Sequence, residues 1–291
     1  MHPMTRLRSR LPHLLGLALS CVCAASPASA QGGRLYGMID ADFLGHDIAF
    51  SVDLGGAHQV RYYPWGRDIK EVEGMAIDRE GELYLFDETG EVKKVRLASP
   101  NARPTAVAPK AEYDFTGASA RPLDGTIELF DNRGLQFVTF DPRTDAFREP
   151  PRRGTRTAAW PELSGLARIG TQLYGSAMNV SRLQIYACTT AGCRPACTLQ
   201  LGPAEDVQAI ERYSGTALVM ARISITDANQ LMLHVESLDP RTCTRQRILE
   251  TQLDRRRIQE FLKPSINLDE MLTEARRRNR SPEIEAIAFQ P

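Results

Sequence analysis

Two carboxylates and three other polar residues occupy the same place in a repeated sequence pattern. Each follows an aliphatic or aromatic residue and precedes a glycine or alanine; the five are Glu73, Thr116, Ser164, Gln208 and Glu285. If the repeats superpose, these side chains form one polar ring. Ca²⁺ or another divalent cation takes ligands from acids, amides and hydroxyls, and two close carboxylates can raise one another's pKa and serve as acid and base. Such a ring can also hold only ordered water and hydrogen-bond partners, so three interpretations stay open.

A second group of candidates lies close together near the start of the chain. It consists of Asp40, Asp42, His46 and Asp47. Carboxylate and imidazole groups at such spacing are possible metal ligands or catalytic groups, but acids near turns also cap the backbone. Asp87-Glu88 and Asp131-Asn132 recur after corresponding apolar runs, which favours turn chemistry over a site.

The motifs of several enzyme classes are missing from the sequence. It has neither the Gly-x-Ser-x-Gly elbow of serine hydrolases nor the His-Glu-x-x-His helix of zinc proteases, and it has no glycine-rich phosphate loop. After residue 30 the histidines are His46, His58 and His234. These classes therefore lack the groups that their chemistry needs.

The elements that must position the ring recur along the chain. Copies of an aliphatic, polar, small, aliphatic pattern begin at residues 72, 115, 163 and 207, each followed by a turn and a second apolar run. The spacing falls in the range of a four-stranded propeller blade, roughly 40 to 50 residues. In the copy from Leu163, the strands are expected in LSGLARI, QLYGSAM, RLQIYACT and CTLQLG.

The two ends of the pattern complement each other. IEAIAF, from Ile284, repeats the inner strand with no strand after it, and GRLYGMIDADF, from Gly33, resembles a second strand with no inner strand before it. Pairing them would complete a fifth blade and leave no open sheet edge at the seam. We therefore predict an all-β propeller of about five four-stranded blades, and disfavour an antiparallel sandwich, which does not explain the half-blades. Residues 253–280 have helical spacing and dense charge, and indicate a helical insertion before closure.

The first thirty residues have the pattern of a secretory signal. Arg6, Arg8 and Arg10 precede an apolar stretch from Leu11 to Ala25, and Ala28-Ser29-Ala30 is typical of a cleavage site. A membrane anchor would need a stretch of about 20 apolar residues, and a lipoprotein attached at Cys21 is a minor alternative. We expect residues 1–30 to be the signal peptide and residues 31–291 to form a single exported domain, periplasmic or secreted, with no transmembrane segment.

The charge and cysteine content of residues 31–291 are consistent with export. Loss of the three arginines leaves 33 basic against 36 acidic residues, which argues against general binding to nucleic acid or anionic membranes. Four cysteines remain, Cys188, Cys193, Cys197 and Cys243. An even number in an exported chain predicts two disulfides, and the absence of a Cys-x-x-Cys pair disfavours a metal cluster. Three pairings are possible and the sequence leaves them open; in one of them, Cys188 faces Cys197 across a hairpin and Cys193 reaches Cys243.

Two strings carry a family resemblance. EVEGMAIDREGELYLFDE, from Glu71, and PEIEAIAF, from Pro282, resemble inner strands of propellers of the esterase-like phytase, NHL-repeat and gluconolactonase (senescence-marker) groups. In the gluconolactonase group, a Glu followed by Gly on the first such strand is a divalent-metal ligand at the channel mouth, and Glu73 matches it. The two Asn and the Asp that complete that metal site have no counterparts in this sequence, so the resemblance implies the fold and one ligand rather than lactonase activity.

Three functions fit these observations. The first is a binding module for a small molecule or a protein, with its ligand on the channel face, on the loops or on an aromatic patch that includes Tyr62, Tyr63 and Trp65. The second is a divalent-metal-dependent hydrolase of a lactone or phosphoester, with Glu73 and Glu285 as ligand or base. The third is a structural assembly component that docks through the helical insertion. One fold hosts many functions, so the fold alone does not decide among them.

Overall fold

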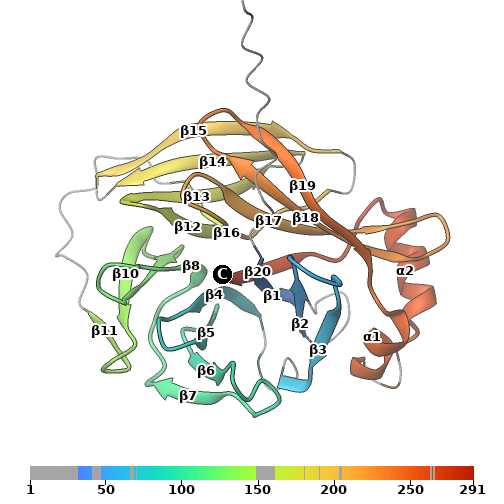
Figure 1. Ribbon diagram of the computed structural model, residues 1–291, viewed down its shortest axis with the longest axis horizontal. Helices are drawn as coiled ribbons and strands as arrows, with labels where there is room; N and C mark the ends of the chain where they lie inside the picture. Colours follow the sequence, from blue (N-terminus) through green and yellow to red (C-terminus); the bar gives the residue numbers. More distant parts are fainter. Residues whose placement is uncertain are drawn as a thin grey trace, which may run out of the picture.

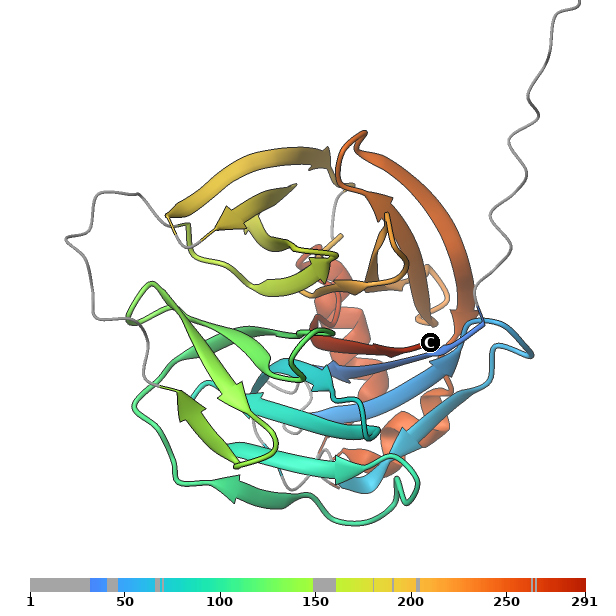
Figure 2. The same ribbon diagram turned by 60° about the vertical axis from the view of Figure 1, so that its left-hand side comes forward.

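The chain forms five four-stranded antiparallel sheets that follow one another around a ring, as the sequence predicts (Figures 1 and 2). The computed structural model describes residues 32–40, 47–65, 69, 71–148, 161–179, 181–189, 191–202, 205–262, 264 and 266–291. The predicted signal peptide, residues 1–30, and the candidates Asp42 and His46 lie outside these ranges. The ring excludes the sandwich alternative.

Four of the five sheets are continuous in sequence and run from an inner strand outward; each is named here by its inner strand. The β4 blade contains β4 (Val72–Ile77), β5 (Glu82–Asp87), β6 (Val92–Arg96) and β7 (Thr105–Ala108). The β8 blade contains β8 (Phe115–Ala120), β9 (Ile127–Asp131), β10 (Gln136–Asp141) and β11 (Ala146–Arg148). The β12 blade contains β12 (Gly165–Ile169), β13 (Gln172–Asn179), β14 (Arg182–Thr189) and β15 (Gly192–Gln200). The β16 blade contains β16 (Ile210–Arg212), β17 (Leu218–Ile225), β18 (Leu231–Asp239) and β19 (Thr244–Gln252).

The fifth sheet, the closing blade, joins the two ends of the pattern. Its inner strand is β20 (Ile284–Gln290), and β1 (Arg34–Ile39), β2 (Ile48–Asp53) and β3 (Val60–Tyr63) follow outward. β20 pairs antiparallel with β1, with Tyr36 opposite Ala288. The predicted pairing of the half-blades is thereby confirmed.

Small residues allow the inner strands to approach closely at the centre of the ring (Figure 1). A Cβ added at Gly74 would lie 3.1 Å from the Ala118 Cβ in the β8 blade, and one added at Gly117 would lie 2.9 Å from the Leu166 amide nitrogen in the β12 blade. At Gly165 the added atom would lie 2.8 Å from the Gln208 carbonyl oxygen. Each contact is tighter than ordinary packing, so the glycine after three of the five predicted ring positions is a steric requirement of the fold.

The hydrophobic core lies mainly between neighbouring blades rather than at the centre. Five clusters of buried residues fill the seams, and each draws side chains from two adjacent sheets. In the seam between the closing blade and the β4 blade, for example, Tyr36 and Met38 pack with Met75 and Leu85. Alternating apolar residues face a seam because successive side chains of a strand point to opposite faces.

The predicted helical insertion contains two short helices, α1 (Arg255–Phe261) and α2 (Leu268–Arg277), beside β3 and β18 (Figure 1). Asp254 and Asn267 cap their N-termini by accepting backbone N–H groups of the first turn. Ile258 and Leu272 are buried in the same cluster as residues of the closing blade and the β16 blade. The insertion is therefore part of the core on one side. Among the described residues, no helix is long and apolar enough to cross a membrane.

Two disulfides form, as predicted, but their pairing differs from the one in which Cys188 faces Cys197 across a hairpin. Cys188 bonds Cys193, and Cys197 bonds Cys243. The sequence pattern suggested that the outer strand begins at Cys197, whereas β15 begins at Gly192 and Thr189 lies opposite Gly192. The tighter hairpin places Cys193 opposite Cys188 and turns Cys197 toward the β16 blade, where Cys243 follows β18.

Candidate functional site

The candidate site lies at the end of the ring where the inner strands begin, here called the mouth. Because neighbouring strands are antiparallel, the second strand of each blade ends at this face. Asp40 follows β1, the second strand of the closing blade, and its backbone N–H donates to the Glu283 carbonyl at 2.9 Å, just before β20. Asp47 directly precedes β2. Blade closure therefore brings Asp40, Asp47 and Glu285 to one place.

These three carboxylates form a compact cluster. One oxygen of each of Asp40, Asp47 and Glu285 lies within 4.8 Å of the other two. Asp47 is 1% exposed and Glu285 is 8% exposed. The arrangement concentrates negative charge where little water can solvate it.

The environment raises the pKa of the buried members strongly. Burial, followed by the charges of Glu73, Asp40 and Asp47, raises the pKa of Glu285 to about 10. Burial is also the main cause that raises the pKa of Asp47 to about 7. The half-buried Glu73 has a pKa of about 8 because of burial and the neighbouring carboxylates, Glu88 foremost. The ionised form of each group is disfavoured in the absence of a positive partner.

Three buried oxygens at or near the cluster lack a hydrogen-bond partner within the described chain. They are Asp47 Oδ1, Glu285 Oε2 and Thr116 Oγ1. The other Asp47 oxygen, Oδ2, accepts the Val72 amide at 3.4 Å. Buried polar atoms are normally satisfied, so these three oxygens are available to ordered water or to an exogenous group.

The structure divides the five predicted ring residues into two pairs and one residue that joins neither. Glu73 and Glu285 interact electrostatically across adjacent inner strands. Ser164 instead donates to the Gln208 carbonyl at 3.0 Å, and the Gln208 amide donates to Glu283 Oε2. Those bonds join the β12, β16 and closing blades, so Ser164 and Gln208 hold neighbouring blades together. Thr116 belongs to neither network of side-chain bonds.

A second acidic position escaped the sequence analysis. Two residues before each predicted ring residue stands an acid: Glu71, Asp114, Glu162, Asp206 and Glu283. Burial and the charge of Asp206 raise the pKa of Glu283, to which Asp206 is hydrogen-bonded. The signal was an acid, a second residue, a polar residue and then Gly or Ala, which recurs in all five repeats. The acid precedes the inner strand of its blade.

The predicted aromatic binding patch is wrong. Tyr63 and Trp65 are buried and stack on one another with ring centroids 5.7 Å apart. The Trp65 indole N–H donates to the Pro100 carbonyl at 2.8 Å. Tyr62 packs against Phe261 of α1. Tyr63 and Trp65 therefore hold the outer part of the closing blade together, whereas the half-buried Tyr62 lines a surface cavity with Arg61 and Phe261.

Comparisons with known proteins give structural similarity alone. No family model matches the chain, and no curated protein matches its sequence. A chain from the crystal structure of a nidogen/laminin complex is similar over 90% of this chain and 99% of that one, with 11% identity and a TM-score of 0.46. An auxiliary nutrient binding protein from Bacteroides ovatus is similar over 71% of this chain and 52% of its own, with 14% identity and a TM-score of 0.41. This chain thus spans about half the length of the nutrient binding protein.

Proposed function

We propose that this chain is an exported binding protein whose propeller holds a divalent cation at the mouth. The observation that carries the proposal is the cluster of Asp40, Asp47 and Glu285, with oxygens within 4.8 Å of one another. The charged groups that act most strongly on Glu285 are three further carboxylates. A bound cation would supply the missing positive charge and would accept the unpaired oxygens as ligands.

The kind of ligand favours Ca²⁺. Ca²⁺ takes six to eight oxygen ligands from carboxylates, carbonyls and waters in flexible geometry, whereas Mg²⁺ demands a near-ideal octahedron and keeps several waters. Glu73 and Thr116, on the next two inner strands, offer further oxygens of the kinds that Ca²⁺ takes. A cation held by few protein ligands has coordination positions left open. An oxygen-bearing ligand can occupy these positions, and the module would recognise its ligand in this way.

Export is supported by the covalent structure. Two disulfides are present, and disulfides persist in oxidising compartments. The pattern of residues 1–30 is that of a signal peptide. A periplasmic or extracellular location would also expose the mouth to the free Ca²⁺ levels at which weak oxygen sites fill.

The test is calorimetric titration of the metal-free protein, residues 31–291, with CaCl₂, alongside thermal unfolding. We expect one site and a rise in the melting temperature, because a ligand that binds only the native state stabilises it by about 2.7 kcal/mol at a hundredfold excess over its Kd. Asp47→Asn and Glu285→Gln should each lose the site. Glu211→Gln is the matched control, since burial raises the pKa of this carboxyl to about 8 but it lies outside the cluster. Equal Ca²⁺ affinity in all four proteins would refute the proposal.

A metal-dependent hydrolase is the second candidate, and Glu73 is the observation that favours it. Its pKa of about 8 lies near neutral pH, which suits a general base beside a metal-bound substrate. Hydrolysis of p-nitrophenyl phosphate or of a simple lactone by the Ca²⁺-loaded protein, abolished in Glu73→Gln while Ca²⁺ binding persists, would support this function. If the Ca²⁺-loaded protein hydrolyses neither substrate, the hydrolase proposal fails for both and the binding module remains.

A further inference from the structure

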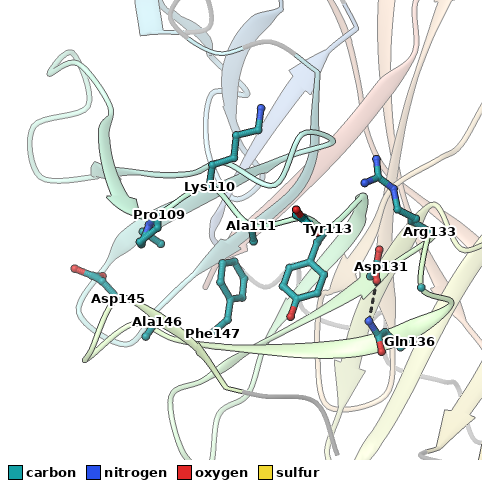
Figure 3. Close-up of a pocket in the computed structure, with 13 residues that line it drawn as sticks. Pro109, Lys110, Ala111, Tyr113, Asp131, Arg133, Gln136, Asp145, Ala146 and Phe147 are labelled. Carbon is teal, nitrogen blue, oxygen red and sulfur yellow. Dashed lines mark hydrogen bonds between the residues drawn. The ribbon is translucent and has the colours of Figure 1, made fainter. Parts of the chain in front are cut away.

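Three polar side chains of the β16 blade have no part in the proposed cation site. Ser224 lies on β17, His234 on β18 and Glu250 on β19, and these strands are neighbours in one sheet (Figure 1). None of the three belongs to the cluster of mouth carboxylates. None of them lines the cavity of about 640 Å³ between the β4 and β8 blades (Figure 3), whose described lining residues include neither serine nor histidine.

The register of the strands brings the three side chains together on one face of the sheet. His234 pairs directly with Glu250, and Ser224 pairs with Met232, two residues before His234. Residues two apart on a strand point to the same face, and diagonal neighbours on paired strands lie within reach of long side chains. Ser224 is the second-to-last residue of β17, so the group lies near the end of the blade that faces the mouth.

The contacts arrange the three groups as a nucleophile, a base and an acid. Ser224 Oγ lies 2.8 Å from His234 Nε2, and His234 Nδ1 lies 3.5 Å from Glu250 Oε2. A carboxylate only accepts hydrogen bonds, so the hydrogen of the neutral ring belongs on Nδ1, and Nε2 accepts the Ser224 hydroxyl. Arg247 Nη1 lies 2.9 Å from the same Glu250 oxygen and helps to hold the carboxylate in place.

The surroundings of His234 favour its neutral, basic form. Burial, followed by the charge of Arg222, lowers the pKa of His234. Weaker charge effects come from Glu250, Glu236 and Arg247. An imidazole whose pKa lies below its ordinary value of 6.5 is neutral at pH 7, so it can take a proton from a neighbouring hydroxyl.

A serine hydroxyl, a histidine and a carboxylate in this order are the groups that acyl transfer uses. We propose that Ser224, His234 and Glu250 form an acyl-transfer site that hydrolyses small carboxylic esters without a metal ion. The sequence has no Gly-x-Ser-x-Gly elbow, but such a triad is recognised by its geometry and not by its place in the sequence. Ser224 is partly exposed, which admits a small ester to its hydroxyl.

The reaction needs only the ester and water. Ser224 Oγ forms a bond to the carbonyl carbon while its proton moves to His234 Nε2. The ester C–O bond then breaks, and the leaving alkoxide takes that proton, so an acyl-serine remains. Water attacks the acyl-serine with His234 again as the base, which releases the carboxylic acid and restores the serine. Glu250 is a positioning residue, because it orients the ring and stabilises the imidazolium.

The experiment is covalent labelling of the mature chain, residues 31–291, with a fluorophosphonate in EDTA, followed by peptide mass spectrometry. We expect the label on Ser224, and we expect hydrolysis of p-nitrophenyl butyrate to stop as the label reacts. His234→Gln should slow the labelling by about 100-fold or more, since a general base contributes about 10²–10⁴-fold. The matched control is Ser237→Ala, which removes a serine of β18 that donates to the Gln246 carbonyl and should leave the labelling rate unchanged.

Glu250→Gln tests the positioning role through the pH profile of labelling. The charge of Glu250 raises the pKa of His234, so its loss should move the midpoint of the profile to lower pH and slow the reaction. The wild-type label position and this profile decide the proposal even if His234→Gln does not fold. Because EDTA removes Ca²⁺, labelling in EDTA also separates this site from the mouth. An unlabelled Ser224, a wild-type rate in His234→Gln, or an unchanged profile in Glu250→Gln would each overturn the proposal.

Discussion

At the scale of single residues, burial decides what the mouth carboxylates can do. An exposed Glu is ionised at neutral pH, whereas Glu285 is almost fully buried beside Asp40 and Asp47. Its carboxylate can be neutralised either by a proton or by a cation, so the two compete for the same oxygens. The stability of the protein should report this competition directly.

The metal-free protein should become less stable between pH 7 and pH 9. Glu285 has a pKa of about 10 when folded, against an ordinary value of 4.5, and Glu73 has a pKa of about 8. Between the unfolded and folded pKa values the native state binds protons that the unfolded state has released, so the free energy of unfolding falls as pH rises. Each pKa unit corresponds to about 1.4 kcal/mol per group.

Thermal unfolding in EDTA, followed by circular dichroism across this range, measures the effect. The pH window lies above the titration of His234, whose pKa is lowered by burial. Glu285→Gln should flatten the dependence, and excess Ca²⁺ should do the same in the wild type. A melting temperature that rises from pH 7 to pH 9 without metal contradicts the assigned environment.

The sequence identified part of this site and missed the rest for a physical reason. Glu73 and Glu285 were found because they occupy one repeat position, which periodicity reveals. Asp40 and Asp47 were noticed as neighbours in sequence, but their contact with Glu285 depends on the pairing of β20 with β1. The cysteine pairing also could not be predicted from the sequence. It depends on the residue at which the hairpin between β14 and β15 turns.

At the scale of elements, inner-strand crowding explains why the repeat pattern is so regular. Gly74, Gly117 and Gly165, each directly after a ring position, face the next inner strand at contact distance. Strand starts were predicted within a few residues: β12 begins at Gly165 and β16 at Ile210, against expected starts at 163 and 207. Leu163 and Val207 are buried outside the ladders, so apolar patterning could not mark the first paired residue.

Gly165→Ala should destabilise the protein by about 1–3 kcal/mol, the usual cost of overpacking. The added methyl would lie 2.7 Å from Ser176 Oγ and 2.8 Å from the Gln208 carbonyl, within backbone that cannot retreat easily. Denaturant unfolding of the variant gives the cost. Gly215→Ala is the control, because its Cβ would meet no atom within 4 Å. Equal unfolding midpoints for the two variants would show that the strands can separate at no cost.

The insertion makes a second prediction at this scale. Leu272 of α2 is fully buried in the core cluster that the closing and β16 blades share. Leu272→Ala should therefore lower the free energy of unfolding by about 2–5 kcal/mol. Leu123→Ala, at a side chain that is 81% exposed, should have little effect. If α2 only docked a partner, the two substitutions would be equivalent in denaturant unfolding of the isolated protein.

At the scale of the whole molecule, closure turns five repeats into one ring. Sequence patterning could predict this because the missing strand at each end of the pattern is supplied by the other. Covalent cross-links add to noncovalent closure: Cys197–Cys243 joins the outer strand of the β12 blade to the turn after β18 in the β16 blade. Cys188–Cys193 instead links neighbouring strands of one hairpin.

The two disulfides should therefore contribute unequally to stability. The two cysteines of Cys197–Cys243 are 46 residues apart in the sequence, and those of Cys188–Cys193 are 5 residues apart. Loop-closure entropy in the unfolded chain then predicts about 4 kcal/mol for the first and about 2 kcal/mol for the second. Urea unfolding of Cys197→Ser/Cys243→Ser and Cys188→Ser/Cys193→Ser double variants compares them with matched chemistry. If removal of the hairpin disulfide costs as much as removal of the inter-blade disulfide, local packing of the sulfurs rather than the linkage between blades determines their contribution.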